Sequence, residues 1–253
     1  MDILYITKTS PLADGGGGEE RARHVTSGLA SRGHDVTVLC GKTDPDLEKW
    51  VTHDECTFRH VKSALSFIFY FPTLSFYATR YLFALTSFPV LLWLLMKQDF
   101  DVIIENMTPY PSLSIFAANL FGVLIVAVQH EFYDRSCYET YDPITATIQV
   151  LVQNLLRLGN YAAVITPTTY VAERLDEYGV NGSQLVIVPN GVDVDKHQLP
   201  DINRNKTALI TIGRLSKRKG QDTTLRAFQK VHRQIPEAHL HILGKGPARE
   251  DLE

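Results

Sequence analysis

The 253-residue sequence lacks the features that mark several classes of protein. Its only cysteines, Cys40, Cys56 and Cys137, form no Cys-x-x-Cys pair, so neither a disulfide framework nor a zinc knuckle is expected and reduced thiols are the default. It has no basic excess, since 25 Lys and Arg face 28 Asp and Glu, which argues against a dedicated nucleic-acid-binding protein. No basic segment or cleavage site precedes the first apolar run, so we expect no secretory signal.

One stretch is short of charge. From Ser63 to Met96 the only charged residue is Arg80, and the uncharged runs on its two sides are 17 and 16 residues long. A membrane-spanning helix needs roughly 20 apolar residues. Pro72 and Pro89 also interrupt the runs. We therefore predict one or two buried or interfacial helices, and the many aromatic rings suit peripheral contact with a membrane surface through residues 63–96.

Elsewhere, short apolar runs alternate with helical patterns, which predicts an α/β fold with a parallel sheet and crossover helices. The predicted strands are Ile3–Thr7, Val36–Cys40, Val102–Glu105, Val123–Gln129, Ala162–Thr166, Leu185–Val188, Ala208–Ile212 and His239–Leu243. The predicted helices carry Ala22, Val25 and Leu29 (ending at Gly33), Ile144, Ile148, Leu151, Leu155 and Leu158 (strongly amphipathic), residues 169–178, and Leu225, Phe228, Val231 and Ile235.

A polar stretch without periodicity, 189–206, separates two domains. We predict an N-terminal Rossmann-like domain over residues 1–190, a linker over 191–206 and a partial C-terminal domain over 207–253. Two parallel strands cannot close a sheet that is covered on both faces, so the second domain is predicted to be an incomplete start.

Polar residues follow two strands of the first domain. Gly15–Gly18 follow the first strand and open a helix, so the backbone amides of Gly16 and Gly17 can approach an anion. The run is not G-x-G-x-x-G, which argues against a dinucleotide-binding protein such as an epimerase; the alternative is a flexible surface loop. His130 and Glu131 follow a later strand, where an imidazole can transfer a proton or orient a hydroxyl; the alternative is a structural histidine.

A basic cluster follows the first strand of the second domain. Arg214, Lys217, Arg218 and Lys219 lie within six residues at the carboxyl end of a parallel strand, where α/β sheets bind ligands. Arg binds two phosphate oxygens at once and Lys adds a point charge, so a diphosphate is the expected ligand; the alternative is a solvated basic loop. Gly244 and Gly246 follow the last strand and are predicted to bring a second backbone turn near the crevice at the carboxyl ends of the strands, where the diphosphate would bind.

Taken in order, these segments resemble the retaining glycosyltransferases of family four, whose fold is GT-B, two Rossmann-like domains facing across a cleft. The resemblance spans essentially the whole chain. It rests on GGGGEE at 15–20, ITPT at 165–168, VPNGVD at 188–193, GRL at 213–215 with KG at 219–220, and ILGKGP at 242–247.

The resemblance implies roles for individual residues. Arg214 and Lys219 match the pair that holds the donor diphosphate and stabilises it as a leaving group. Gly16 and Gly17 match the loop that approaches the donor phosphate or the acceptor, and His130 matches a histidine near the sugar. Glu131, Gly244 and Gly246 are further cleft candidates. The family usually works without a catalytic metal, and we expect neither a metal nor a cofactor.

The implied function is transfer of a hexose from a nucleoside-diphosphate sugar to a lipid-linked or polysaccharide acceptor, with retention, in the cytoplasm or at the inner face of the cell membrane. The family carries two glutamates, spaced Glu-x7-Glu, well downstream in the second domain, and this sequence stops before any such segment. The resemblance therefore implies a truncated or split reading frame, or a remainder supplied by another polypeptide, and leaves the activity of these residues alone open. The alternative is a non-catalytic remnant or partner subunit that binds an acceptor or a complementary chain.

Overall fold

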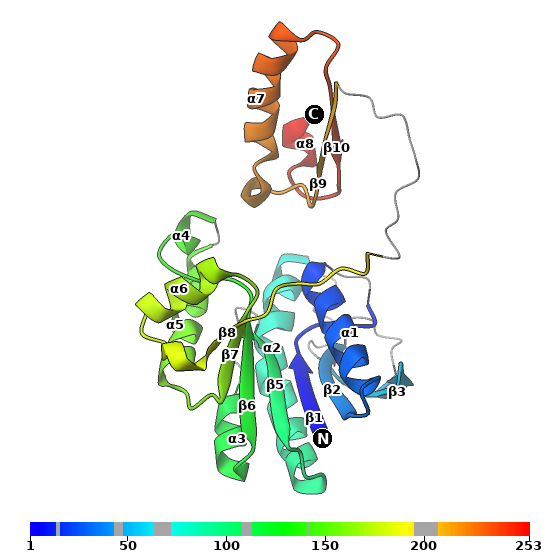
Figure 1. Ribbon diagram of the computed structural model, residues 1–253, viewed down its shortest axis with the longest axis vertical. Coiled ribbons are helices and arrows are strands. Elements are labelled where there is room, and N and C mark those ends of the chain that lie inside the picture. Colours follow the sequence, from blue (N-terminus) through cyan, green and yellow to red (C-terminus); the bar gives the residue numbers. More distant parts are fainter. Residues whose placement is uncertain (14–15, 43–47, 63–71, 108–112, 141, 195–206) are drawn as a thin grey trace. The chain divides into compact units, whose positions relative to one another are not determined.

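The computed structural model describes residues 1–13, 16–42, 48–62, 72–107, 113–140, 142–194 and 207–253, with the backbone alone at 62, 72–81, 107 and 140. Gly15, most of the predicted linker (195–206) and residues 63–71 of the apolar segment lie outside the described residues. The chain divides into two compact units, Met1–Gly191 and Val192–Glu253 (Figure 1).

The first unit is built on an eight-stranded sheet in the order β3-β4-β2-β1-β5-β6-β7-β8. Every neighbouring pair is parallel except β3 with β4, which confirms the α/β prediction. The strands are β1 Asp2–Thr7, β2 Asp35–Lys42, β3 Trp50–His53, β4 Cys56–Lys62, β5 Val102–Met107, β6 Leu124–Gln129, β7 Ala163–Thr166 and β8 Leu185–Ile187.

The hairpin of β3 and β4 was not predicted from the sequence. Its turn residues, Asp54 and Glu55, have positive φ angles of 47° and 61°. Two consecutive positive φ angles are typical of the tight hairpin turn that usually contains Asn-Gly or Asp-Gly. Asp-Glu gives no such signal, so the sequence does not reveal the turn.

Helices cover both faces of this sheet. They are α1 Gly17–Ala30, α2 Pro72–Lys97, α3 Ser114–Phe121, α4 Cys137–Thr140, α5 Pro143–Leu158 and α6 Thr169–Glu177. Ile3 and Tyr5 of β1 belong to a buried cluster with α1, whereas Leu4 and Ile6 belong to a second cluster that includes α2 and α3. Side chains alternate between the faces of a strand, so β1 is buried on both sides.

Where the structure describes it, the apolar segment forms one helix, α2. Pro89 was predicted to interrupt this segment but lies inside the helix. Phe83, Leu91 and Leu94 are buried, while Pro89 lies on the exposed side, where water can hydrogen-bond the carbonyl that proline leaves free. Pro72 is the first residue of α2, a position that proline tolerates. Within the described part of the chain, no helix combines the length and apolar character needed to cross a bilayer.

Helix α5 forms as predicted, but only Ile148 and Leu155 of its predicted apolar stripe pack against the core. Ile144, Leu151 and Leu158 are exposed, and the buried positions are Thr145, Ala146, Gln149, Val152, Gln153 and Leu156. Gln153 explains part of the difference. Its side chain accepts a hydrogen bond from the Tyr133 amide at 2.7 Å and donates one to the Tyr133 carbonyl at 3.0 Å, so a polar side chain anchors the helix.

The second unit contains two parallel strands and the helices that follow them. These are β9 Ala208–Ile212, the 3₁₀ turn Lys217–Lys219, α7 Gln221–Gln234, β10 His239–Leu243 and α8 Arg249–Leu252. Both strands and α7 were predicted. Leu215 and Ala238 are the buried apolar residues of this unit.

Candidate functional site

Three polar side chains from three strands meet at the carboxyl edge of the large sheet. His130, directly after β6, donates from Nε2 to Oδ1 of Asn106 on β5 at 2.6 Å. Asn106 in turn donates from Nδ2 to the Thr7 hydroxyl at the end of β1 at 3.4 Å. Thr7 and Asn106 are buried. The contact with Asn106 therefore fixes the imidazole ring and leaves Nδ1 as its unprotonated nitrogen.

The surroundings of His130 favour its neutral form. Burial is the largest cause of its lowered pKa, and the positive charge of Arg21 lowers it further, while Glu131 and Glu19 act in the opposite direction. A neutral imidazole can accept a hydrogen bond from a hydroxyl at Nδ1. The residue is thus suited to orient a hydroxyl or to take a proton.

The lowered pKa predicts a pH-dependent stability. Between the folded pKa and the unfolded value of about 6.5, the unfolded chain binds more protons than the folded chain. The free energy of unfolding should therefore fall as the pH drops below about 6.5, and His130→Gln should reduce this slope. Urea unfolding between pH 7 and pH 5, followed by tryptophan fluorescence, measures it. Equal slopes in the two proteins would contradict the assignment.

The first turn of α1 begins at the predicted glycines. Gly16 is the N-cap, and its amide donates to Oε2 of Glu19 at 2.9 Å. A Cβ atom at Gly17 or Gly18 would meet no other atom within 4 Å. Packing within the fold therefore does not require glycine at these two positions, and the space beside them is open to a ligand.

Arg21, on the second turn of α1, contacts the Val188-Pro189-Asn190 segment after β8. Its guanidinium donates to the Val188 carbonyl at 3.3 and 3.2 Å and to Oδ1 of Asn190. Arg21 thereby joins α1 to the segment after β8, which is far away in the sequence. Together with burial, its positive charge also lowers the pKa of His130.

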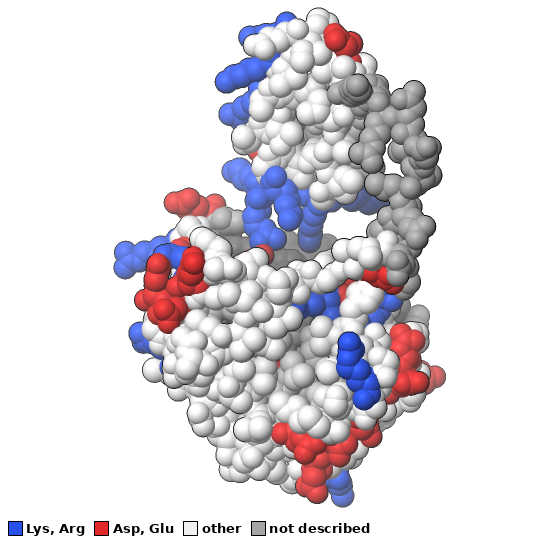
Figure 2. Space-filling model, viewed as in Figure 1, with Lys and Arg blue, Asp and Glu red and all other residues white. Residues whose placement is uncertain are grey.

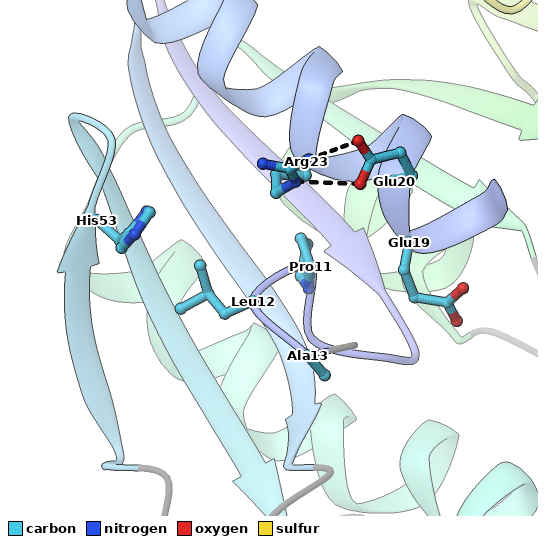
Figure 3. Close-up of a pocket in the computed structure, with 7 residues that line it drawn as sticks. All are labelled: Pro11, Leu12, Ala13, Glu19, Glu20, Arg23 and His53. Carbon is cyan, nitrogen blue, oxygen red and sulfur yellow. Dashed lines mark hydrogen bonds and ion pairs between the residues drawn. The ribbon is translucent and has the colours of Figure 1, made fainter. Parts of the chain in front are cut away.

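A pocket of about 510 Å³ lies beside the first two turns of α1 (Figure 3). It is lined by Pro11, Leu12, Ala13, Glu19, Glu20, Arg23 and His53. Arg23 and Glu20 point toward each other and pair at 2.5 Å, and the hydrogen bond from Arg23 lowers the pKa of the Glu20 carboxyl. The lining is mostly polar, which suits a ligand with hydroxyl groups.

In the second unit, Lys and Arg side chains gather where β9 and β10 end (Figure 2). Arg214 follows β9, and Lys219 ends the 3₁₀ turn; both are exposed. The buried side chain of Gln221 donates to the Arg214 carbonyl at 3.1 Å and so holds this backbone in place. Gly220 has φ of 66°, the left-handed conformation that starts α7 immediately after Lys219.

Two glycines pack the turn after β10 against the turn after β9. A Cβ atom at Gly244 would overlap the carbonyl of Gly213, and one at Gly246 would overlap the carbonyl of Leu215. The turns are joined by hydrogen bonds from the Gly213 amide to Leu243 and from the Leu215 amide to Lys245, each 3.0 Å long. Close backbone packing thus requires glycine here, and a place for these residues in a binding cleft stays a prediction.

Among the described residues, no group of three or more His, Cys, Asp or Glu side chains is placed to hold a metal ion.

The sequence matches two family models in succession. The model described as Glycosyltransferase Family 4 matches residues 15–196, and the model described as Glycosyl transferases group 1 matches residues 194–253. The chain belongs to Glycosyltransferase Family 4. The resemblance predicted from the motifs is thereby confirmed.

The chain matches part of the length of two relatives. It is 32% identical to phosphatidyl-myo-inositol mannosyltransferase of Mycobacterium tuberculosis over 155 residues, which cover 59% of this chain and 38% of that protein. It is 24% identical to alpha-monoglucosyldiacylglycerol synthase of Streptococcus pneumoniae over 252 residues, covering 91% of this chain and 53% of the synthase. The chain thus spans about half or less of these relatives' length.

Solved structures share the fold. Sucrose-phosphate synthase from Thermosynechococcus elongatus matches with a TM-score of 0.70 at 20% identity, covering 96% of this chain and 62% of the synthase. Anabaena HepE in complex with UDP-glucose matches with a TM-score of 0.60 at 15% identity, covering 97% of this chain and 69% of HepE. These matches confirm the predicted GT-B-like fold of this family 4 chain.

The site residues predicted from the sequence are divided between the two units of the structure. Gly16, Gly17, His130 and Glu131 belong to the first unit, and Arg214, Lys219, Gly244 and Gly246 belong to the second. Sequence reasoning missed Arg21 and Asn106, and it gave no role to Asn190 of the VPNGVD motif. Asn106 lies at the end of a buried strand, the same signal that identified His130, and could have been found in the same way.

Proposed function

We propose that the chain takes part in glycosyl transfer, in which a hexose moves from a nucleoside-diphosphate sugar to a lipid-linked or polysaccharide acceptor with retention of configuration. The observation that carries the proposal is the pair Arg214 and Lys219, exposed at the carboxyl end of β9 in a family 4 chain. Negative charge grows on the diphosphate as the glycosidic bond breaks, and a guanidinium and an ammonium group beside it stabilise that charge.

The relatives' names support the classes of donor and acceptor. HepE was solved with UDP-glucose, a nucleoside-diphosphate sugar. The mannosyltransferase named for phosphatidyl-myo-inositol and the synthase named for a glucosylated diacylglycerol both point to lipid acceptors. We therefore favour a lipid-linked acceptor over a polysaccharide.

The first unit supplies groups suited to the sugar and the acceptor. The neutral His130, oriented by Asn106, can accept a hydrogen bond from a sugar hydroxyl at Nδ1. The open space beside Gly17 lets an anionic or hydroxylated group approach the amides of the first turn of α1. Glu131, next to His130, is a second polar candidate for the same ligand.

A lipid-linked acceptor predicts peripheral contact with the inner face of the membrane through α2. Leu85, Trp93 and Met96 form an exposed apolar stripe at spacings of about two turns and one turn. Replacing Leu85 and Met96 together by serine should lower the partition onto phospholipid vesicles about tenfold, because each side chain loses apolar area that the bilayer would cover. Vesicle co-sedimentation measures the partition.

The control is an equal change on another helix of the same unit. Leu151 and Leu158 of α5 are 60% and 74% exposed, against 63% and 65% for Leu85 and Met96. Serine at both α5 positions should leave the partition unchanged. An equal loss in both double variants would show that general surface hydrophobicity, rather than α2, governs binding.

The transfer reaction itself is tested by a donor screen. The purified chain is incubated with radiolabelled UDP-hexoses and GDP-hexoses, with and without a lipid extract, and both transfer and donor hydrolysis are measured. Turnover or saturable binding of one donor class supports the proposal. If no donor is turned over or bound, the alternative of a non-catalytic chain that binds an acceptor or a complementary chain takes its place.

A further inference from the structure

Two adjoining pockets lie in the first unit beside the β3–β4 hairpin, and the second of them also borders α2. One, of about 330 Å³, is lined by Lys42, Lys49, Arg59, His60 and Val61. The other, of about 380 Å³, is lined by Lys49, Trp50, Arg59, Pro89, Val90 and Trp93. Lys49 and Arg59 line both. Lys42 ends β2, so the first pocket is at the carboxyl edge of the sheet.

Arg59 is buried without a carboxylate among its described contacts. Only 8% of the residue is exposed, and its guanidinium donates to the His60 carbonyl at 2.8 Å. Its Nε is buried with no hydrogen-bond partner in the described part of the chain. Burial lowers the pKa of the guanidinium, which still stays charged. Burying a cation is unfavourable unless an anion lies beside it. A negatively charged ligand next to Arg59 would therefore lower the free energy of the folded state.

The other polar groups among the described lining residues are positively charged or neutral. Lys49 is exposed. Both nitrogens of His60 have partners, since Nδ1 donates to the Glu48 carbonyl at 2.8 Å and Nε2 accepts from the Ser10 hydroxyl at 3.0 Å. His60 is therefore a structural residue here. Among the described residues that line the two pockets there is no Asp or Glu.

Two aromatic rings form the apolar wall. Trp50 and Trp93 are 40% and 44% exposed, and their ring centroids are 6.3 Å apart. The Arg59 guanidinium lies 5.1 Å from the centre of the Trp50 ring, a cation–π contact that holds the charge in place. A charged floor beside exposed tryptophans suits a ligand with an anionic group and an apolar or glycerol part.

We propose that this pocket binds a phosphate ester, with Arg59 and Lys49 holding the phosphate and the two tryptophans contacting the attached group. The phosphate belongs either to a phospholipid headgroup or to a soluble phosphorylated compound, since both present the same oxygens. None of its lining residues is among those assigned to the donor diphosphate, which are Arg214 and Lys219 of the second unit and Gly16 and Gly17 at the start of α1.

The chain carries its own reporter for this site, because its only two tryptophans both line the pocket. Fluorescence of the full chain is titrated with glycerol 3-phosphate, with glycerol, and with vesicles of phosphatidylcholine alone or containing phosphatidylglycerol. A saturable change with glycerol 3-phosphate but not glycerol supports a soluble ligand. A change with the anionic vesicles that the neutral vesicles do not produce supports a headgroup.

Variants decide whether the change comes from this pocket. Lys49→Gln, at an exposed position that should not disturb folding, and Arg59→Gln should each weaken binding about tenfold. Arg32→Gln removes the same charge from an exposed position at the end of α1 and should bind like the parent. Absence of a change with both phosphate probes, or equal binding by all four proteins, would overturn the proposal. No sugar donor is present, so the outcome is independent of the transfer reaction.

Discussion

Alanine at Arg214 or at Lys219 is expected to weaken the binding of a nucleoside diphosphate about ten- to hundredfold. Each side chain offers charge-assisted hydrogen bonds to phosphate oxygens, and such bonds contribute about 1.5–3 kcal/mol. Arg214 is the more sensitive position, because a guanidinium can bind two oxygens at once and an ammonium cannot. Calorimetric titration with UDP and with GDP measures both affinities.

A neighbouring lysine provides the matched control. Lys217 lies in the same 3₁₀ turn and is exposed, but it matches no donor-binding position of the family motif. Lys217→Ala should weaken binding less than threefold, which is the size expected when only the general positive field is reduced. Should all three variants lose affinity equally, the cluster would act as a diffuse basic surface and the specific assignment of Arg214 and Lys219 would fail.

Alanine at Gly246 is expected to destabilise the second unit by about 2–4 kcal/mol. The new methyl group would overlap the Leu215 carbonyl, so the turn after β10 must move and the hydrogen bond from the Leu215 amide to Lys245 is strained. Hydrogen–deuterium exchange over β9 and β10 should rise accordingly. Fluorescence should not change, because Trp50 and Trp93 both belong to the first unit.

Gly18 serves as the comparison. A Cβ atom there meets nothing within 4 Å, and the residue lies in the first turn of α1. Gly18→Ala should therefore stabilise the first unit by about 0.5–1 kcal/mol, because alanine loses less conformational entropy in a helix. If Gly246→Ala were equally harmless, the close packing of the two turns would not hold in solution.

Most strands could be predicted because parallel strands buried on both faces leave continuous apolar runs between turn residues. β4 carries Arg59 and His60 in its middle, so its run is broken and it was missed. Helix α3 was missed for the opposite reason: Ser114–Phe121 is apolar on almost every position and shows no helical period. Only part of the apolar stripe of α5 faces inward, since Gln153, a polar residue outside the stripe, is buried and hydrogen-bonded to the backbone of Tyr133.

The candidate site divides in a similar way. His130 and the basic cluster could be found because the ends of parallel strands are where ligands bind. The contacts that orient His130 and hold Arg21 in place could not be predicted in this way. Asn106 and His130 are 24 residues apart, and Arg21 and Asn190 are 169 apart, so only the folded sheet brings each pair together. The Arg59 pocket depends on a hairpin turn without a recognisable signal.

The strand order has a consequence for synthesis of the chain. On one side of β1 the sheet adds β2, β4 and β3, and on the other it adds β5, β6, β7 and β8. No strand has to insert between two strands that are already paired. A nascent polypeptide leaving the ribosome can therefore dock most strands onto an available edge as they emerge. The exception is β3, whose partner β4 is translated after it, and one edge of β1 stays unpaired until β5 has been translated.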